Sequence, residues 1–172
     1  MEDRQGVRVL VAFATRSGAT ADVARAVADR LSERGGRVDV RRVQDVTECS
    51  PYGLVVVGSA VRMGRWLPAA VRFVEQHVAA LRLVPTAFFT VHMLNIDDSV
   101  GSIQRRRAYL DPVRATFTPD HEAYFAGRMA LDHLGTMDRL IARLVKARDG
   151  DLRHWRAIRD WADEITIPPP AT

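Results

Sequence analysis

A short polar segment near the start of the chain has the residue types of a phosphate-binding loop. It is Thr15-Arg16-Ser17-Gly18-Ala19-Thr20, and it lies between an apolar stretch, residues 7–14, and a pattern typical of a helix, residues 21–34. The first backbone N–H groups of a helix have no partner within the helix, and the aligned peptide dipoles place about half a positive charge there. Three hydroxyl side chains add donors, and the glycine tolerates a positive φ and allows close approach. We expect this strand-to-helix junction to bind a phosphate monoester.

Three better-known phosphate sites do not fit this segment. A P-loop requires G-x-x-x-x-G-K-[ST], but the one lysine of the chain, Lys146, lies far away in the sequence. The dinucleotide fingerprint requires two further glycines around Gly18. A phosphoacceptor receiver domain needs acidic residues at the ends of its first and third strands, whereas residues 13–15 and 57–59 contain none. Nucleoside triphosphate hydrolysis, NAD bound in the Rossmann manner and phosphoacceptor chemistry are therefore disfavoured.

The composition predicts one globular domain in a reducing compartment. The chain has 172 residues, 47% of them hydrophobic, and a single cysteine. We expect a domain core over residues 7–165 and a tail over residues 166–172. The longest apolar runs are shorter than the roughly 18 to 20 residues of a membrane helix, and the polar N-terminus does not resemble a signal peptide. These features predict a cytoplasmic protein, at most peripheral to the membrane.

The formal net charge of +4 comes almost entirely from arginine. Neither zinc-ligand spacing nor an aromatic RNA-binding motif accompanies it, so we do not expect a nucleic-acid partner.

Strand and helix patterns alternate along the whole chain. The expected strands are residues 7–14, 37–43, 54–57, 86–92 and 123–127. The expected helices are residues 21–34, 67–83, 103–116 and 152–165, with loops over residues 58–66 and 95–102. The helix 103–116 is expected to be interrupted or to end near Pro112. This order predicts an α/β fold, a doubly wound parallel sheet of five strands with helices on both faces. Ligands bind beyond the C-terminal ends of such strands, where Thr15, Ser59 and His92 fall.

An extra amphipathic helix is expected before the last one, over residues 136–148. Its apolar stripe is Met137, Leu140, Ile141, Leu144 and Val145, and its opposite face carries Arg139, Arg143, Lys146 and Arg148. Two interpretations are open: packing of the stripe against the sheet, and docking of the basic helix on an anionic membrane surface.

These segments resemble the flavodoxin-like proteins, and within them the short, FMN-dependent protoporphyrinogen dehydrogenase type that passes electrons to quinone. Flavodoxins bind the FMN phosphate with a T-x-x-G-x-T loop, which Thr15, Gly18 and Thr20 match. Residues 57–65, 73–77 and 85–91 are similar to that family's second flavin loop, the following helix and the fourth strand. The extra helix is also a feature of that family. The resemblance extends over residues 7–165 and is strongest up to Val91.

The resemblance implies an FMN-dependent oxidoreductase that uses quinone or another redox partner and oxidises a porphyrinogen-like substrate. Backbone amides of two further segments would meet the flavin ring, and the chemistry requires neither a catalytic acid or base nor a metal. The residues expected to bind FMN are Thr15, Arg16, Ser17, Gly18, Ala19, Thr20, Ser59, Ala60, Val61, Arg62, Met63, Gly64, Val91, His92, Met93, Leu94 and Asn95. Flavodoxin-type loops often place an aromatic ring against the flavin, whereas this chain has Met63 there and Trp66 three residues later. Residues 95–107 also depart from the family pattern.

Several side chains near this site have more than one interpretation. Arg62 favours an anionic reduced flavin, binds substrate carboxylates, or is a solvated loop arginine. His92 contacts flavin or substrate, or is a hydrogen-bonded structural histidine. Arg16 pairs with phosphate or faces water, and Trp66 caps the flavin loop or packs on the following helix. Arg105-Arg106-Arg107 is expected to be the solvated face of a helix, with contact to an anion as the alternative.

The cysteine and the other histidines lack the sequence spacing of a catalytic thiol site or a metal site. Cys49 has no histidine spaced for a catalytic thiol, and His121, His133 and His154 lack metal-ligand spacing.

Two functions compete with the oxidoreductase. One is a flavodoxin-like FMN electron carrier without its own substrate, and the other is a flavin-free binding module. Carriers of that kind are usually acidic because they dock on basic partners, so the net charge of +4 disfavours a carrier. The intact hydroxyl-rich loop disfavours a flavin-free module.

Overall fold

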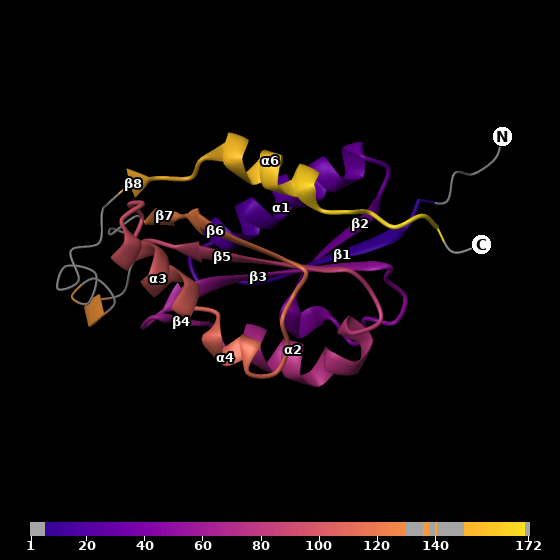
Figure 1. Ribbon diagram of the computed structural model, residues 1–172, viewed down its shortest axis with the longest axis horizontal. Coiled ribbons are helices and arrows are strands. Elements are labelled where there is room, and N and C mark those ends of the chain that lie inside the picture. Colours follow the sequence, from indigo (N-terminus) through magenta and orange to yellow (C-terminus); the bar gives the residue numbers. More distant parts are fainter. Residues whose placement is uncertain (1–5, 130–135, 138–139, 141–149, 171–172) are drawn as a thin grey trace.

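A parallel sheet forms the centre of the molecule, with helices on both faces (Figure 1). The computed structural model describes residues 6–129, 136–137, 140 and 150–170. The parallel strands, in spatial order, are β2 (Arg37–Arg42), β1 (Arg8–Ala14), β3 (Leu54–Arg62), β5 (Thr86–His92) and β6 (His121–Ala126). Helices α1 (Ala19–Glu33) and α6 (Trp155–Glu164) cover one face, and α2 (Pro68–Leu81) and α4 (Asp111–Arg114) cover the other. The expected doubly wound α/β fold is confirmed.

The central strands are apolar on both faces because a helix layer covers each face. Along β1, Val9 and Val11 pack with α1 and α6, while Leu10 and Ala12 pack with α2. Gly58 of β3 allows the closest approach within this core. A Cβ at Gly58 would lie 2.0 Å from Cζ of Phe89, so only glycine fits beneath that ring.

Residues 58–66 form a hairpin instead of the expected loop. Strand β3 continues to Arg62 and pairs antiparallel with β4 (Arg65–Trp66). Met63 and Gly64, between the two strands, both have positive φ, 51° and 72°. A two-residue type I′ turn requires positive φ at both positions, and it matches the twist of paired strands. Methionine is rare at such a position, which is why the sequence pattern did not reveal the turn.

Other boundaries also differ from the prediction. The expected helix 103–116 begins three residues earlier, as α3 (Val100–Ala108). The interruption expected near Pro112 is confirmed, since α4 follows α3 and Pro112 lies in the first turn of α4, where a missing N–H costs nothing. The strand expected to reach Val43 ends in a short 3₁₀ helix, η1 (Val43–Asp45).

The last helix begins at Trp155, three residues later than expected. Leu152 donates its N–H to the Gly127 carbonyl, next to a small sheet of β7 (Arg128–Met129) and β8 (Gly150–Asp151). The His154 side chain then accepts a hydrogen bond from the Ala157 N–H and caps α6.

The expected basic helix over residues 136–148 lies outside the described residues, except for residues 136–137 and 140. Of the helices in the described ranges, none has the length and apolar content needed to cross a bilayer.

Candidate functional site

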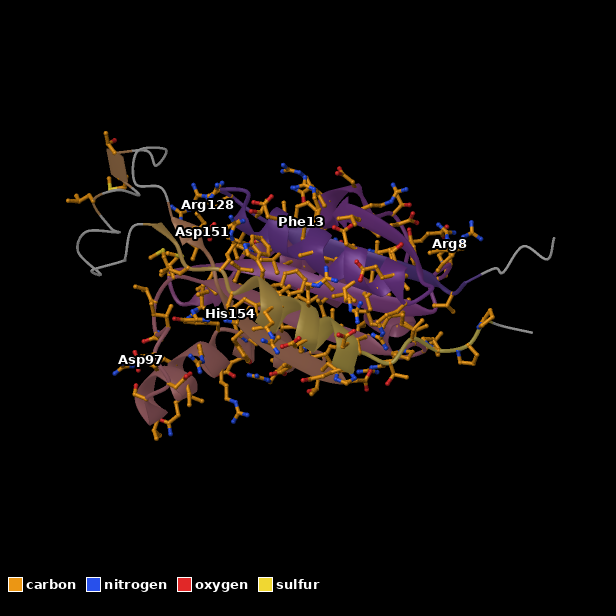
Figure 2. The ribbon with its side chains drawn as sticks, turned by 90° about the horizontal axis from the view of Figure 1, so that it is seen from above. Arg8, Phe13, Asp97, Arg128, Asp151 and His154 are labelled. Atoms are coloured by element: carbon orange, nitrogen blue, oxygen red, sulfur yellow. The ribbon has the colours of Figure 1, made fainter. Side chains whose placement is uncertain are left out.

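Strand register places three loops at one edge of the sheet. Ala14 at the end of β1 pairs with Ser59 of β3, and Ser59 pairs with Thr90 of β5. The loops that follow these positions therefore leave the sheet next to one another (Figure 1). Figure 2 shows Asp97 and Asp151 at this end of the molecule and Arg8, at the start of β1, at the other. The predicted site residues lie in these three loops and the adjoining element ends.

The loop after β1 ends in an open helix N-terminus. Gly18 is the N-cap of α1, with φ 89°, and the Gly18 N–H donates to Thr15 Oγ1 at 3.0 Å. The first intrahelical bond runs from the Asp22 N–H to the Gly18 carbonyl. Among the described residues, no side chain caps α1, so the backbone N–H groups of its first turn remain available to an anion. A Cβ at Gly18 would have no heavy atom within 4 Å, so the space beside this turn is open.

The buried Thr20 hydroxyl is the feature that most directly indicates a ligand. The residue is 1% exposed, and its Oγ1 is the only buried side-chain N or O atom within the described part of the chain that lacks a hydrogen-bond partner. Buried hydroxyls are nearly always paired, because an unpaired one costs about 1–3 kcal/mol. An unpaired hydroxyl in the first turn of a helix fits a bound phosphate oxygen. The residues present therefore fit the phosphate of a cofactor such as FMN.

The β3–β4 hairpin forms the second part of the site. Ser59 is fully buried, and its hydroxyl donates to the Ala60 carbonyl at 2.8 Å and accepts from the Leu67 N–H at 3.1 Å. The Ser59 side chain therefore holds the base of the hairpin. Ala60, Val61, Arg62, Met63 and Gly64 continue to the tip, where Met63 is 84% exposed.

Trp66 belongs to the core. It is 2% exposed, its ring lies 5.6 Å from that of Phe88, and its Nε1–H donates to Thr90 Oγ1 at 2.8 Å. Since Val61 pairs with Trp66 on this inner face, Arg62 and Arg65 lie opposite each other on the outer face of the hairpin. Met63, and not Trp66, is thus the exposed apolar side chain of this loop.

The loop after β5 is held by hydrogen bonds from α3. Val91 and His92 end β5, and Met93 and Leu94 then lead to Asn95, which has a φ of 57°. The Asn95 amide donates to the Tyr109 hydroxyl, and the Arg106 guanidinium donates to the carbonyls of Asn95 and Asp97 at 3.3 and 3.1 Å. Ser99 and Ser102 also bond to Asp97 and hold the pKa of that carboxyl well below its usual range.

The run Arg105-Arg106-Arg107 was expected to be the solvated face of a helix, and for Arg106 this expectation is wrong. Its side chain is only 17% exposed and also pairs with Asp98 at 2.9 Å. Arg106 is therefore a structural part of the loop, whereas Arg105 and Arg107 are exposed as expected. The arginine run alone could not show which of the three points inward.

His92 is a buried, hydrogen-bonded histidine. It is 4% exposed, and its Nδ1 lies 2.8 Å from the Leu94 carbonyl. Because a carbonyl only accepts, Nδ1 carries a proton. Burial lowers the pKa of His92, and the nearby Arg106 acts in the same direction, while the bond to Leu94 opposes them. These effects favour the neutral ring with Nε2 unprotonated.

Arg153 is a residue near this site that sequence patterns did not reveal. Its guanidinium pairs with Asp22 in the first turn of α1 and with Asp151 of β8. The two paired segments lie 131 residues apart, so no local spacing could connect them.

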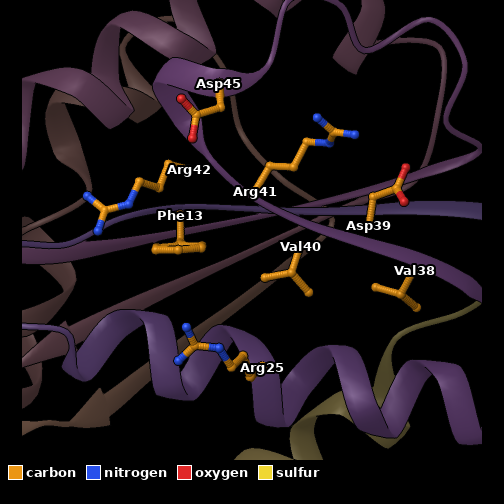
Figure 3. A pocket seen from close by; sticks show the side chains of 8 residues that line it. All are labelled: Phe13, Arg25, Val38, Asp39, Val40, Arg41, Arg42 and Asp45. Atoms are coloured by element: carbon orange, nitrogen blue, oxygen red, sulfur yellow. The ribbon is translucent and has the colours of Figure 1, made fainter.

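A separate open groove runs along the edge strand β2 and contains none of the predicted site residues (Figure 3). Phe13, Val38 and Val40 point toward α1 in this view, while Asp39 and Arg41 point away from it. The groove is lined by Phe13, Arg25, Val38, Asp39, Val40, Arg41, Arg42 and Asp45.

Thiol and metal chemistry find no support in the described residues. Burial raises the pKa of the Cys49 thiol to about 11, which disfavours the reactive thiolate. Within the residues described, no three His, Cys, Asp or Glu side chains gather as metal ligands would.

Comparison with known proteins agrees with this arrangement. Residues 10–153 match the family described as Flavodoxin domain. The chain belongs to this flavodoxin family. The expected family and fold are thus confirmed, and membership supports FMN as the cofactor.

Relatives and solved structures extend the comparison. Protoporphyrinogen IX dehydrogenase [quinone] of Escherichia coli K12 is 28% identical over 90% of this chain and 89% of its own length. A short-chain flavodoxin superimposes with a TM-score of 0.56 at 12% identity, over 92% of this chain and 96% of that one. An NADH:FMN oxidoreductase in its apo form has a TM-score of 0.55 at 12% identity, over 95% and 92% of the two chains. The two structures resemble this flavodoxin-family chain in fold.

Proposed function

We propose that this chain is an FMN-dependent oxidoreductase that oxidises a porphyrinogen-like substrate and passes electrons to quinone. The observation that carries the cofactor assignment is the unpaired Thr20 hydroxyl beside the uncapped N-terminus of α1. The substrate and acceptor are taken from the relative of similar length, protoporphyrinogen IX dehydrogenase [quinone].

The loop after β1 would hold the phosphate of FMN through Thr15, Ser17, Thr20 and the first amides of α1, with Arg16 beside them. The hairpin, residues 59–64, and the loop after β5, residues 91–95, would meet the ring through their backbone. Bound FMN supplies the hydride and electron transfer. The protein orients the cofactor, and the hydrogen bonds that hold the hairpin and the loop after β5 reduce the ordering cost of binding. His92 keeps a proton at Nδ1, held toward the Leu94 carbonyl.

The side chains on the outer face of the hairpin suit a substrate that is anionic and partly apolar. Arg62 and Arg65 lie opposite each other at the end of the hairpin and place two positive charges on its outer face. The exposed Met63 lies between them in the sequence. A porphyrinogen combines carboxylates with a large apolar ring, which matches this combination of side chains.

An FMN electron carrier without its own substrate is the second candidate function. The net charge of +4 favours the enzyme, because carriers that dock on basic partners need acidic surfaces. Contact with the inner face of a membrane, through the basic residues 136–148, is part of the proposal for a quinone-linked cytoplasmic enzyme. Flotation with phosphatidylglycerol vesicles, compared with neutral vesicles, tests that contact.

Two measurements test the function. Titration of the purified protein with FMN and riboflavin, followed by quenching of flavin fluorescence, should show binding of FMN. The loaded protein should then oxidise protoporphyrinogen with menaquinone as acceptor. Binding without turnover, but with electron exchange to a redox protein, would favour the carrier. Binding of neither flavin would refute both functions.

A further inference from the structure

Arg153 is a nearly buried cation that connects the segment between β8 and α6 to the first turn of α1. Its side chain is 7% exposed. The guanidinium donates to Asp22 at 2.7 Å and to the two carboxylate oxygens of Asp151 at 2.7 and 2.6 Å. It also lies over the Trp155 ring, 4.5 Å from the centroid. These contacts fix both its position and its charge.

Asp22 is placed where its charge matters to a bound phosphate. It lies in the first turn of α1, and its N–H makes the first intrahelical bond, to Gly18. A carboxylate there is stabilised by the helix dipole in the free protein, but it repels a phosphate at the same helix end. Arg25 pairs with Asp22 at 3.1 Å, although its side chain is 64% exposed, so water screens that pair.

We infer that Arg153 is a positioning residue of the phosphate-binding end of α1, where it cancels the charge of Asp22 and fastens the helix end to β8. This inference rests on the proposed function insofar as the ligand is the phosphate of FMN. Asp22, Asp151, Arg25 and Arg153 together carry no net charge. Loss of Arg153 removes one positive charge about one helical turn from the phosphate, beside the Asp22 carboxylate. Figure 2 shows Asp151 at the end of the molecule where α1 begins.

The inference predicts a defect that depends on the phosphate. Arg153→Gln should weaken FMN binding roughly tenfold at low salt, because a unit charge within about 10 Å of a dianion acts through partly screened surroundings. Binding of riboflavin, which lacks the phosphate, should change less than twofold. The difference should shrink in 0.5 M salt. Arg156→Gln is the matched control, since Arg156 lies in the same segment and its side chain is 87% exposed.

The partner variant completes the test. Asp22→Asn should tighten FMN binding in the otherwise unchanged protein and should restore FMN binding in Arg153→Gln. Equal weakening of FMN and riboflavin binding in Arg153→Gln would show a general structural role and overturn the inference. If Arg153→Gln does not fold, Asp22→Asn alone decides, and an unchanged or weaker FMN affinity overturns the inference. Failure of the proposed function can be distinguished from failure of this inference, because the unaltered protein would then bind no flavin.

Discussion

The loops after β1 and β5 lie at the same edge of the sheet, but they are stabilised in opposite ways. The loop after β1 leaves polar groups open: Gly18 offers no side-chain cap, and Thr20 Oγ1 is buried without a partner. The loop after β5 satisfies its polar groups internally, through Arg106 and the Asp97 carboxylate. The first loop therefore offers hydrogen-bonding groups to the proposed ligand, while the second loop is held by hydrogen bonds within the protein.

This difference assigns separate tasks to the two loops. An anion bound at the first loop would gain the hydrogen bonds that the free protein lacks, so the loop supplies affinity for phosphate. The second loop and the β3–β4 hairpin supply shape, because their backbone is fixed before binding. Variants of the first loop should change affinity without loss of stability, and variants of the scaffold should lower stability.

The largest effect on the free energy of unfolding is expected at Gly58 of β3, which packs against the Phe89 ring. Gly58→Ala should lower the free energy of unfolding by about 3 kcal/mol, because the new methyl group overlaps the Phe89 ring. Urea denaturation measures this loss. Gly101→Ala is the control, since a Cβ there has no heavy atom within 4 Å, and it should leave stability unchanged or raised. Equal stability of the two variants would contradict the packing argument.

The next largest effect on stability is expected for the loop after β5, which hydrogen bonds within the protein hold in place. Arg106→Ala removes hydrogen bonds to two loop carbonyls and should lower the free energy of unfolding by about 2 kcal/mol. FMN and riboflavin affinities should fall by the same factor, because the loop faces the ring rather than the phosphate. Arg105→Ala, at an exposed neighbour, should change neither quantity. A defect confined to FMN would assign Arg106 to the phosphate instead.

The reverse pattern is expected for Thr20→Val. This variant keeps the side-chain shape but removes the unpaired hydroxyl, so the cofactor-free protein should unfold at an equal or higher denaturant concentration. FMN affinity should fall about tenfold, equivalent to about 1.4 kcal/mol. Thr20→Ser, which keeps the hydroxyl, should retain most of the affinity. Unchanged FMN binding in Thr20→Val would remove the central argument for the phosphate site.

The smallest effect concerns pH. Burial lowers the pKa of His92 below its ordinary value of about 6.5, so as the pH falls below that value the unfolded chain binds a proton that the folded protein excludes. Stability should therefore be full above about pH 7 and should decrease as the pH falls further. Burial also lowers the pKa of His77, so His92→Asn should reduce the loss of stability at low pH only in part. An unchanged pH profile in that variant would assign the whole effect to His77 or to other groups.

The hairpin and the arginine run of α3 show where local sequence patterns failed. Residues 58–66 carry no Asn-Gly or Asp-Gly signal, and the positive φ of Met63 depends on the pairing of Trp66 with the core. The run Arg105-Arg106-Arg107 reads as uniformly polar, yet one arginine turns inward to bond loop carbonyls. Both outcomes depend on contacts with residues elsewhere in the chain.

The sequence by itself determined the sheet of this protein and the loop for which we propose phosphate binding. Alternating apolar strands and helices set the parallel topology, and a hydroxyl-rich turn with one glycine at the start of a helix is a local pattern whose chemistry can be read directly. Only the tertiary structure decided that Thr20 lacks a partner, that His92 and Trp66 are buried, and that Arg153 reaches Asp22. These features arise from side chains brought together across the sheet, and spacing along the chain carries no information about such contacts.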